Sequence, residues 1–179
     1  MGVKVRERKG MYRYLTFGLL TFLFTISMAV TVYSGQFEDA TAAHDRGDYA
    51  TAYRLWKPMA EQGIAEAQLM LGIIYGIGQG VPQDSAEATK WYRRAAEQGY
   101  ADAQLMLGLL YAKGQDVPQD YVLAHMWFNL AASRFPASEG EKRKQTVKNR
   151  DIVASKMTPY QIAEAQRLAR EWKPKKEVR

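Results

Sequence analysis

The 179-residue sequence predicts an all-α protein: a short α/α solenoid of helix-turn-helix repeats with a carboxyl-terminal helical cap and an amino-terminal signal or anchor helix. Three observations lead to this fold class. A segment of 36 residues occurs twice in tandem, its apolar residues recur at helical spacing, and an uncharged stretch follows a basic cluster near the amino terminus. The absence of cysteine excludes disulfide bonds and thiolate metal sites.

Residues 1–34 are interpreted as a signal peptide or a membrane anchor. Five basic side chains precede a run without charge from Tyr14 to Phe37, which is the order of a secretory signal. Because the positive cluster stays in the cytoplasm, the rest of the chain is expected to be periplasmic or secreted, with cleavage after Ser34. If residues 14–32 stay uncleaved, they are long enough to cross a ~30 Å hydrocarbon core and would anchor the repeats on the far side of the inner membrane.

The duplicated segment defines two full repeats, 64–99 and 100–135. Residues 65–75 read AEAQLMLGIIY and residues 101–111 read ADAQLMLGLLY, and a period of this length is typical of stacked helical arrays. The first helix of each repeat has apolar residues on two sides, as a helix buried between neighbours requires.

A turn and a second helix complete each repeat. In the first copy the turn is the sequence GIGQGVP, whose glycines permit a left-handed backbone and whose proline prevents the helix from continuing. Asp84 and its counterpart Asp120 are predicted to cap the second helix by accepting from free backbone amides.

A divergent first repeat is expected over residues 37–63. Its second-helix pattern aligns Trp56 and Ala60 with Trp91 and Ala95, at an offset of 35 residues instead of 36. Terminal repeats commonly diverge, so the solenoid is predicted to span 37–135.

Both full copies carry the pattern Leu-Gly-x-x-Tyr-x-x-Gly-x-x-Val-x-x-Asp-x-x-x-Ala-x-x-Trp-aromatic-x-x-Ala-Ala. The pattern resembles the Sel1-like repeat, a relative of the tetratricopeptide repeat. The resemblance implies an α/α superhelix and a non-catalytic adaptor, scaffold or regulator in the bacterial cell envelope. Some cysteine-rich relatives are described as acting on peptidoglycan or β-lactams, so an envelope enzyme remains an alternative, as does a membrane-anchored scaffold.

Residues 136–179 are predicted to form a helical cap and a basic tail. Ser138 is expected to open a charged surface helix through Lys142 to Lys156. A second helix should begin at Thr158, with threonine as N-cap, proline at the first position and Gln161 at the third.

The net charge of +6 is unevenly distributed. Residues 1–34 carry five basic and one acidic side chain, and residues 142–179 carry twelve and four, so residues 35–141 have a net charge of −6. We therefore expect part of the basic tail to dock on the acidic solenoid.

No catalytic, metal-binding or cofactor-binding residue, and no cofactor, is expected. His44 and His125 have no other ligand at metal-binding spacing. The aromatic residues repeat in register, which favours core packing over a stacking platform. Nucleic acid is not an expected partner, because the chain is predicted to be exported.

The expected partner is an unidentified envelope protein bound on the solenoid surface. Positions that differ between the two copies within a fixed framework are the candidates for choosing it. They are Ile77 and Lys113, Lys90 and Met126, Arg93 and Asn129, and Arg94 and Leu130.

Overall fold

The computed structural model describes residues 35–114 and 117–175. The predicted signal or anchor segment, 1–34, lies outside the described residues. The chain divides into two compact units, Met1–Asp39 and Ala40–Arg179. Of the first unit only residues 35–39, which are helical, are described. The helices and contacts below belong to the second unit.

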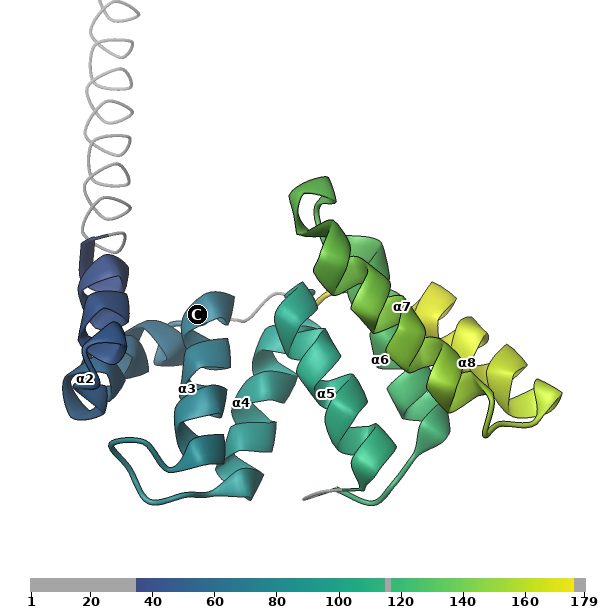
Figure 1. The fold of residues 1–179 in the computed structure, drawn as a ribbon, viewed down its shortest axis with the longest axis horizontal. Coiled ribbons are helices and arrows are strands. Elements are labelled where there is room, and N and C mark those ends of the chain that lie inside the picture. The colour runs from purple at the N-terminus through teal and green to yellow at the C-terminus, as the bar shows by residue number, and fades with distance from the viewer. Residues whose placement is uncertain (1–34, 115–116, 176–179) are drawn as a thin grey trace, which may run out of the picture. The chain divides into compact units, whose positions relative to one another are not determined.

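Within the described part of the second unit, every regular element is a helix (Figure 1). A helix that ends at residue 45 is followed by α2 (Tyr49–Glu61), α3 (Ala65–Ile77), α4 (Ser85–Glu97), α5 (Ala101–Lys113), α6 (Tyr121–Arg134), the short 3-10 helix η1 (Ala137–Glu139), α7 (Gly140–Ala154) and α8 (Pro159–Glu171). The all-α prediction is confirmed. Among the described residues, no helix combines the length and hydrophobicity needed to cross a membrane.

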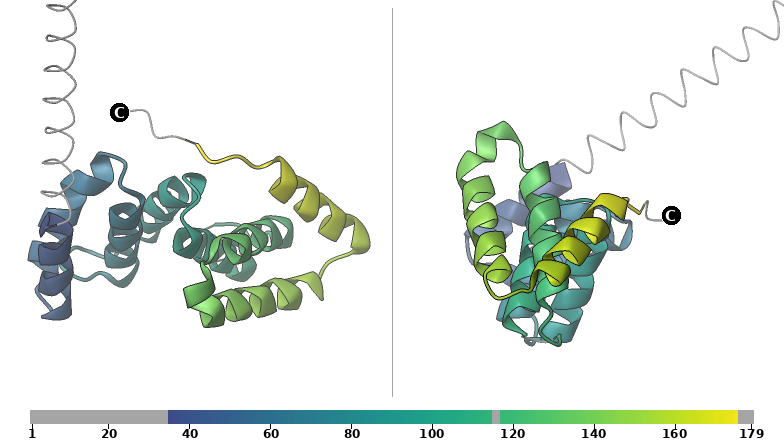
Figure 2. Two further views of the ribbon diagram at one scale, coloured as in Figure 1. Left: turned by 90° about the horizontal axis from the view of Figure 1, so that it is seen from above. Right: turned by 90° about the vertical axis from the view of Figure 1, so that its right-hand side faces the viewer.

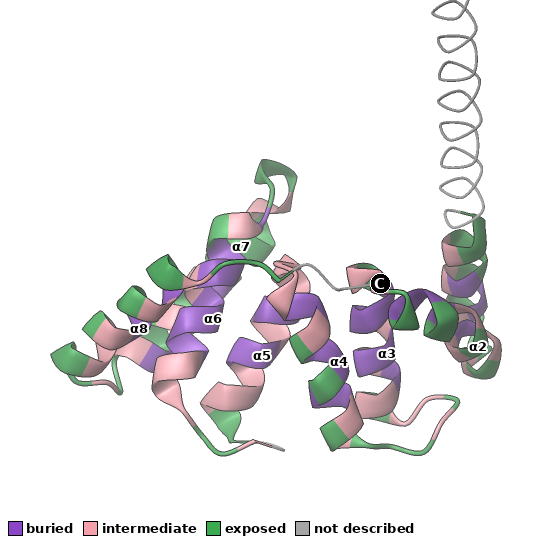
Figure 3. Cartoon of the chain, turned by 180° about the vertical axis from the view of Figure 1, so that it is seen from behind, coloured by how far each residue is buried: buried purple, intermediate pink, exposed green. Residues whose placement is uncertain are grey.

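Neighbouring helices pack in chain order, which confirms the solenoid. α2 contacts α3, α3 contacts α4, and the same pairing continues through α5 and α6. α6 then contacts both α7 and α8, which lie on its opposite sides (Figure 2). Buried residues, purple in Figure 3, follow the faces where neighbouring helices meet.

The turn within each repeat is formed as its sequence predicts. Gly78 ends α3 and Gly114 ends α5 in the left-handed region, at φ of 73° and 69°. Asp84 and Asp120 cap the following helices, each accepting a backbone N–H at 2.9 Å from the residue three positions on. The acids are therefore structural, as expected.

Close packing inside each repeat depends on a glycine facing an aromatic ring. A Cβ on Gly108 would lie 2.5 Å from two ring carbons of Phe128, and Gly72 faces Tyr92 in the same way. Both rings are buried. Only glycine at these positions leaves room for the ring, so the helices of a pair approach closely.

The predicted offset of 35 for the first repeat is wrong. α2 and α4 are both 13 residues long and begin after capping aspartates 36 positions apart. The buried amide of Gln68 donates to the carbonyl of Ala60 at 3.0 Å, and Gln104 donates to Ala96 at 3.1 Å. Trp56 therefore corresponds to Tyr92 and not to Trp91. The predicted offset was wrong because aligning the two tryptophans shifted the first repeat by one residue.

The carboxyl-terminal cap differs from the prediction at one helix start. Ser138 lies in η1, and α7 begins at Gly140 after Glu139, which makes no side-chain capping bond. α8 begins as predicted, with a capping box between Thr158 and Gln161 and a proline at its first turn.

The start of the basic tail docks on the solenoid, and one of its contacts pairs opposite charges as predicted. The Trp172 ring, which is half-buried, meets Trp127 edge-on at 6.4 Å between centroids, and the Arg134 guanidinium stacks on it at 4.4 Å. Lys175 then donates its backbone N–H to the Glu97 carbonyl at 2.8 Å and pairs its ammonium with the Glu97 carboxylate at 3.0 Å. These contacts connect the segment after α8 to α6 and to the end of α4.

Candidate functional site

A groove of about 400 Å³ lies between the two full repeats. α3 and α5 form its walls and α4 its floor. The lining residues are Ile73, Gly76 and Ile77 of α3, Gln83 of the turn, Ser85, Ala88, Thr89 and Tyr92 of α4, and Met106 and Leu110 of α5.

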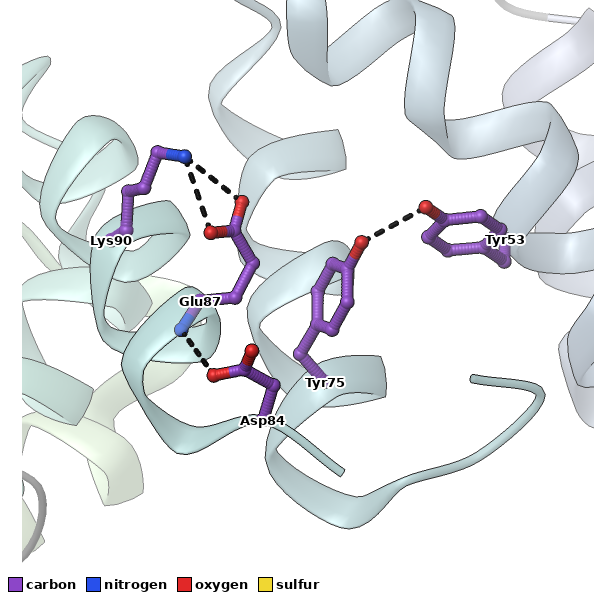
Figure 4. A network of polar contacts seen from close by, with 5 residues as sticks. All are labelled: Tyr53, Tyr75, Asp84, Glu87 and Lys90. Atoms are coloured by element: carbon purple, nitrogen blue, oxygen red, sulfur yellow. Dashed lines mark hydrogen bonds and ion pairs between the residues drawn. The ribbon is translucent and has the colours of Figure 1, made fainter. Parts of the chain in front are cut away.

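The groove lies where α4 carries a small side chain, that of Thr89. With the offset of 36, the position of Thr89 is held by Tyr53 in the first repeat and by His125 in the last. In the first repeat the Tyr53 ring meets Tyr75 edge-on at 5.8 Å, and their hydroxyls form a hydrogen bond of 2.9 Å (Figure 4). Thr89 is too short to make the equivalent contact with Tyr111, the counterpart of Tyr75.

Two of the polar donors that line the groove are used within the protein. The Thr89 hydroxyl donates to the Ser85 carbonyl at 2.9 Å, and the Gln83 amide donates to the Gly76 carbonyl at 2.9 Å. The rest of the lining is aliphatic apart from Ser85, Tyr92 and the backbone of Gly76. The groove is therefore suited to an apolar side chain, since such a group displaces water without leaving these donors unpaired.

The Tyr92 hydroxyl on the floor makes no intramolecular hydrogen bond among the described residues. The Tyr92 hydroxyl lies 3.6 Å from the place where a Cβ on Gly76 would stand. A tyrosine phenol is protonated at neutral pH, and burial raises the pKa of Tyr92 further, to about 12. It is available to donate a hydrogen bond to a bound group.

Positive side chains flank the groove on its α4 and α5 side. Arg93, one turn beyond Thr89, donates to the Tyr111 hydroxyl at 3.3 Å. Lys113 continues the stripe of α5 that contains Met106 and Leu110, and its side chain is exposed. Within the part of the chain that the structure describes, neither cation has a carboxylate within 4.0 Å.

Three of the eight candidate partner-binding residues thus belong to one surface. Ile77 lines the groove and is 57% exposed, and Arg93 and Lys113 flank it. Lys90 is exposed on α4 but its ammonium is paired with Glu87 at 3.1 Å (Figure 4).

The other four candidates are engaged within the protein. The Arg94 guanidinium stacks on Trp91 at 4.7 Å, and Asn129 accepts from Arg150 at 3.3 Å. Met126 and Leu130 are buried, with 6% and 5% exposed, so neither presents a side chain to a partner. Their difference from the first copy is an end effect, because α6 is covered by α7 and α8 whereas α4 is followed by another repeat.

Sequence reasoning missed the residues that shape the groove. Thr89, Tyr92 and Met106 are not among the site residues predicted from the sequence. The signal was the variation at one position, Tyr53, Thr89 and His125. The wrong offset of 35 concealed it by aligning Tyr53 with Ala88.

Neither histidine is placed for metal binding. His125 is buried on α6, and burial, followed by the positive charge of Arg150, lowers the pKa of its imidazole. The imidazole of His44 lies 3.5 Å from the carboxylate of Asp45. In residues 35–114 and 117–175 no three His, Cys, Asp or Glu side chains gather closely enough to hold a metal ion.

The Sel1 repeat family model matches the chain three times, at residues 42–64, 65–100 and 101–134. This chain belongs to the Sel1 repeat family. Sel1 repeats generally mediate protein–protein interactions. The search of curated proteins gave no match to the sequence.

Two solved structures resemble this Sel1 repeat protein. A protective antigen of uropathogenic Escherichia coli with an SLR fold is 29% identical with a TM-score of 0.70, over 78% of this chain. The match spans only 29% of the antigen's own length. A Sel1 repeat protein from Oxalobacter formigenes is 34% identical with a TM-score of 0.53, over 63% of this chain and 88% of that protein.

Proposed function

We propose that this protein is a non-catalytic interaction module of the bacterial cell envelope, exported by its amino-terminal segment, that holds a protein partner in the groove between α3 and α5. The observation that carries the proposal is the groove itself. It lies beside Thr89, the counterpart of the Tyr53 that contacts the next helix in the first repeat, and most of its lining is apolar. An interaction surface needs such a site for an anchoring side chain.

The envelope location is supported by the order of charge and hydrophobicity in residues 1–34. The same run also favours a second form of the proposal, in which residues 14–32 remain in the inner membrane and present the repeats on its far side. Cell fractionation together with mass spectrometry of the mature amino terminus distinguishes the two. A mature chain beginning near Gly35 in the periplasm or medium supports export with cleavage, an intact amino terminus in the membrane supports the anchor, and a cytoplasmic chain contradicts both.

The groove is tested by filling it. Thr89→Tyr introduces the side chain that the first repeat carries, with its hydroxyl placed to bond Tyr111 as Tyr53 bonds Tyr75. Tagged wild-type and variant proteins are crosslinked in the native envelope and purified. We expect a protein that co-purifies with the wild type and is lost with the variant, while Lys144→Ala on α7 retains it. Equal recovery with Thr89→Tyr contradicts the proposed binding site, and hydrolysis of peptidoglycan or a β-lactam by the purified protein would favour the enzyme alternative.

A further inference from the structure

The chemistry of the groove and of its flanking charges defines the kind of segment that it accepts; this inference rests on the proposed function and makes it more specific. Tyr53 shows what fits such a site. It is an aromatic ring that packs edge-on against the tyrosine of the next helix, at 5.8 Å between centroids. Thr89 stands at the same register and lines the groove, so a ring supplied from outside has space beside it, between α3 on one side and Met106 and Leu110 of α5 on the other.

The flanking charges select the neighbours of that ring. Arg93 and Lys113 are exposed cations without a carboxylate partner among the described residues. The nearby acids are already engaged, since Asp84 caps α4 and Glu87 pairs with Lys90. A carboxylate placed beside Arg93 or Lys113 would therefore meet a cation that has no carboxylate partner among the described residues.

We propose that the groove binds an acidic peptide segment of the partner, in which an aromatic side chain enters between α3 and α5 and an adjacent carboxylate pairs with Arg93 or Lys113. The Tyr92 hydroxyl, protonated on the groove floor, donates a hydrogen bond to the bound segment. Ile77, more than half exposed at the mouth, closes over the ring from the α3 side.

Three capped synthetic pentapeptides test this segment chemistry: Gly-Asp-Phe-Asp-Gly, Gly-Asp-Ala-Asp-Gly and Gly-Lys-Phe-Lys-Gly. Binding is followed by NMR chemical shifts of Ile77, Met106 and Leu110 in the full chain. We expect the first peptide to shift these resonances with a Kd of about 1 mM or tighter, and to bind at least about tenfold more tightly than either of the others. Raised salt should weaken this binding, because the charged contacts are exposed.

Two variants locate the contacts. Thr89→Tyr should abolish the shifts, and the double variant Arg93→Glu with Lys113→Glu should reverse the preference between the acidic and basic aromatic peptides. A control double variant, Arg143→Glu with Lys148→Glu on α7, makes the same change in net charge away from the groove and should leave the preference intact. The two double charge variants change only exposed side chains, so they keep the test valid even if Thr89→Tyr unfolds the protein.

The results separate this inference from the proposed function. Absence of shifts with the acidic aromatic peptide, or equal binding of all three peptides, overturns the inference. If a native partner is nevertheless lost with Thr89→Tyr in the envelope, the groove remains the binding site and only the assigned segment chemistry is wrong. If peptide binding is seen but no native partner depends on Thr89, the chemistry is correct and the proposed function is wrong.

Discussion

The hydroxyls of Tyr53 and Tyr75 lie 2.9 Å apart and join the first repeat to the second (Figure 4). Both side chains are half-buried, and the rings meet edge-on. In the next repeat Tyr111 keeps the place of Tyr75, but Thr89 replaces Tyr53 and Arg93 supplies the hydrogen bond instead. A single change on α4 thus exchanges an intramolecular contact for an accessible groove.

Two substitutions of Tyr53 should destabilise the protein to different extents. We expect Tyr53→Phe to lower the free energy of unfolding by about 1 kcal/mol, since it removes one hydrogen bond and keeps the ring. Tyr53→Ala should cost about 3 kcal/mol, because the ring packing against Tyr75 is lost as well. Urea denaturation followed by circular dichroism measures both, and equal stability of the two variants would contradict the contact.

The glycine facing Phe128 should not tolerate a methyl group. Gly108→Ala places a Cβ 2.5 Å from the ring, so we expect a loss of about 1–3 kcal/mol. The control is Gly140→Ala at the start of α7, where nothing lies within 4 Å and helix propensity favours alanine. Thermal unfolding should show a lower Tm for the first variant and an unchanged or slightly higher Tm for the second. A similar Tm for the two variants would show that the helices separate easily.

The two buried glutamines should differ in importance although they are repeat counterparts. Gln68 donates to the Ala60 carbonyl and accepts from Gln98 at 2.8 Å, whereas the side-chain oxygen of Gln104 is buried without a partner among the described residues. We expect Gln68→Met to cost about 2 kcal/mol and Gln104→Met less than about 1 kcal/mol, because the latter also removes an unsatisfied acceptor. Chemical denaturation measures the free energy of unfolding of both variants. A larger loss of stability for Gln104→Met than for Gln68→Met would contradict these hydrogen-bond assignments.

Stability should fall in mild acid through His125. Burial lowers the pKa of this imidazole below its ordinary value of 6.5, so the folded protein favours the neutral ring while the unfolded chain takes up a proton near pH 6.5. The unfolding free energy should therefore be highest above pH 6.5 and should decline as the pH falls below it. Nearby Arg150 disfavours the proton further, and Asp151 opposes it only in part.

Thr89, the repeat counterpart of His125, suggests a matched variant for this titration, His125→Thr. In His125→Thr the hydroxyl can bond the carbonyl one turn back, as Thr89 does with Ser85. Denaturation at several values between pH 5 and pH 7.5 should show that this variant loses the decline below pH 6.5. His44→Asn, at the partly exposed histidine, should keep it. An unchanged pH dependence in His125→Thr would assign the effect to other groups.

The sequence predicted the repeats, caps and turns because each depends on local chemistry. Capping aspartates and turn glycines act within a few residues, and repetition in register made them visible. Predicting the groove requires a comparison of one position, that of Thr89, across the three repeats. The conspicuous match of Trp56 to Trp91 displaced that comparison by one residue. The capping aspartates and the hydrogen bonds of Gln68 and Gln104 settle the register, which sequence similarity alone did not.

End effects account for the other failures at the candidate site. Met126 and Leu130 differ from their counterparts because α7 and α8 cover α6, and this depends on how the cap folds back. The start of α7 was also mispredicted, since Ser138 is part of a 3-10 helix instead of a cap. Neither feature repeats in the sequence, so periodicity gave no information about it.

The most direct test of the binding groove is photo-crosslinking from inside it. A photoreactive residue is placed at Ile77, which lines the groove, and separately at Ile152 on α7, which is similarly exposed at 49%. In living cells we expect a discrete crosslinked partner from position 77 only, and its disappearance when Thr89→Tyr is added. The same partner from both positions, or a crosslink from position 77 that persists with Thr89→Tyr, would contradict the account.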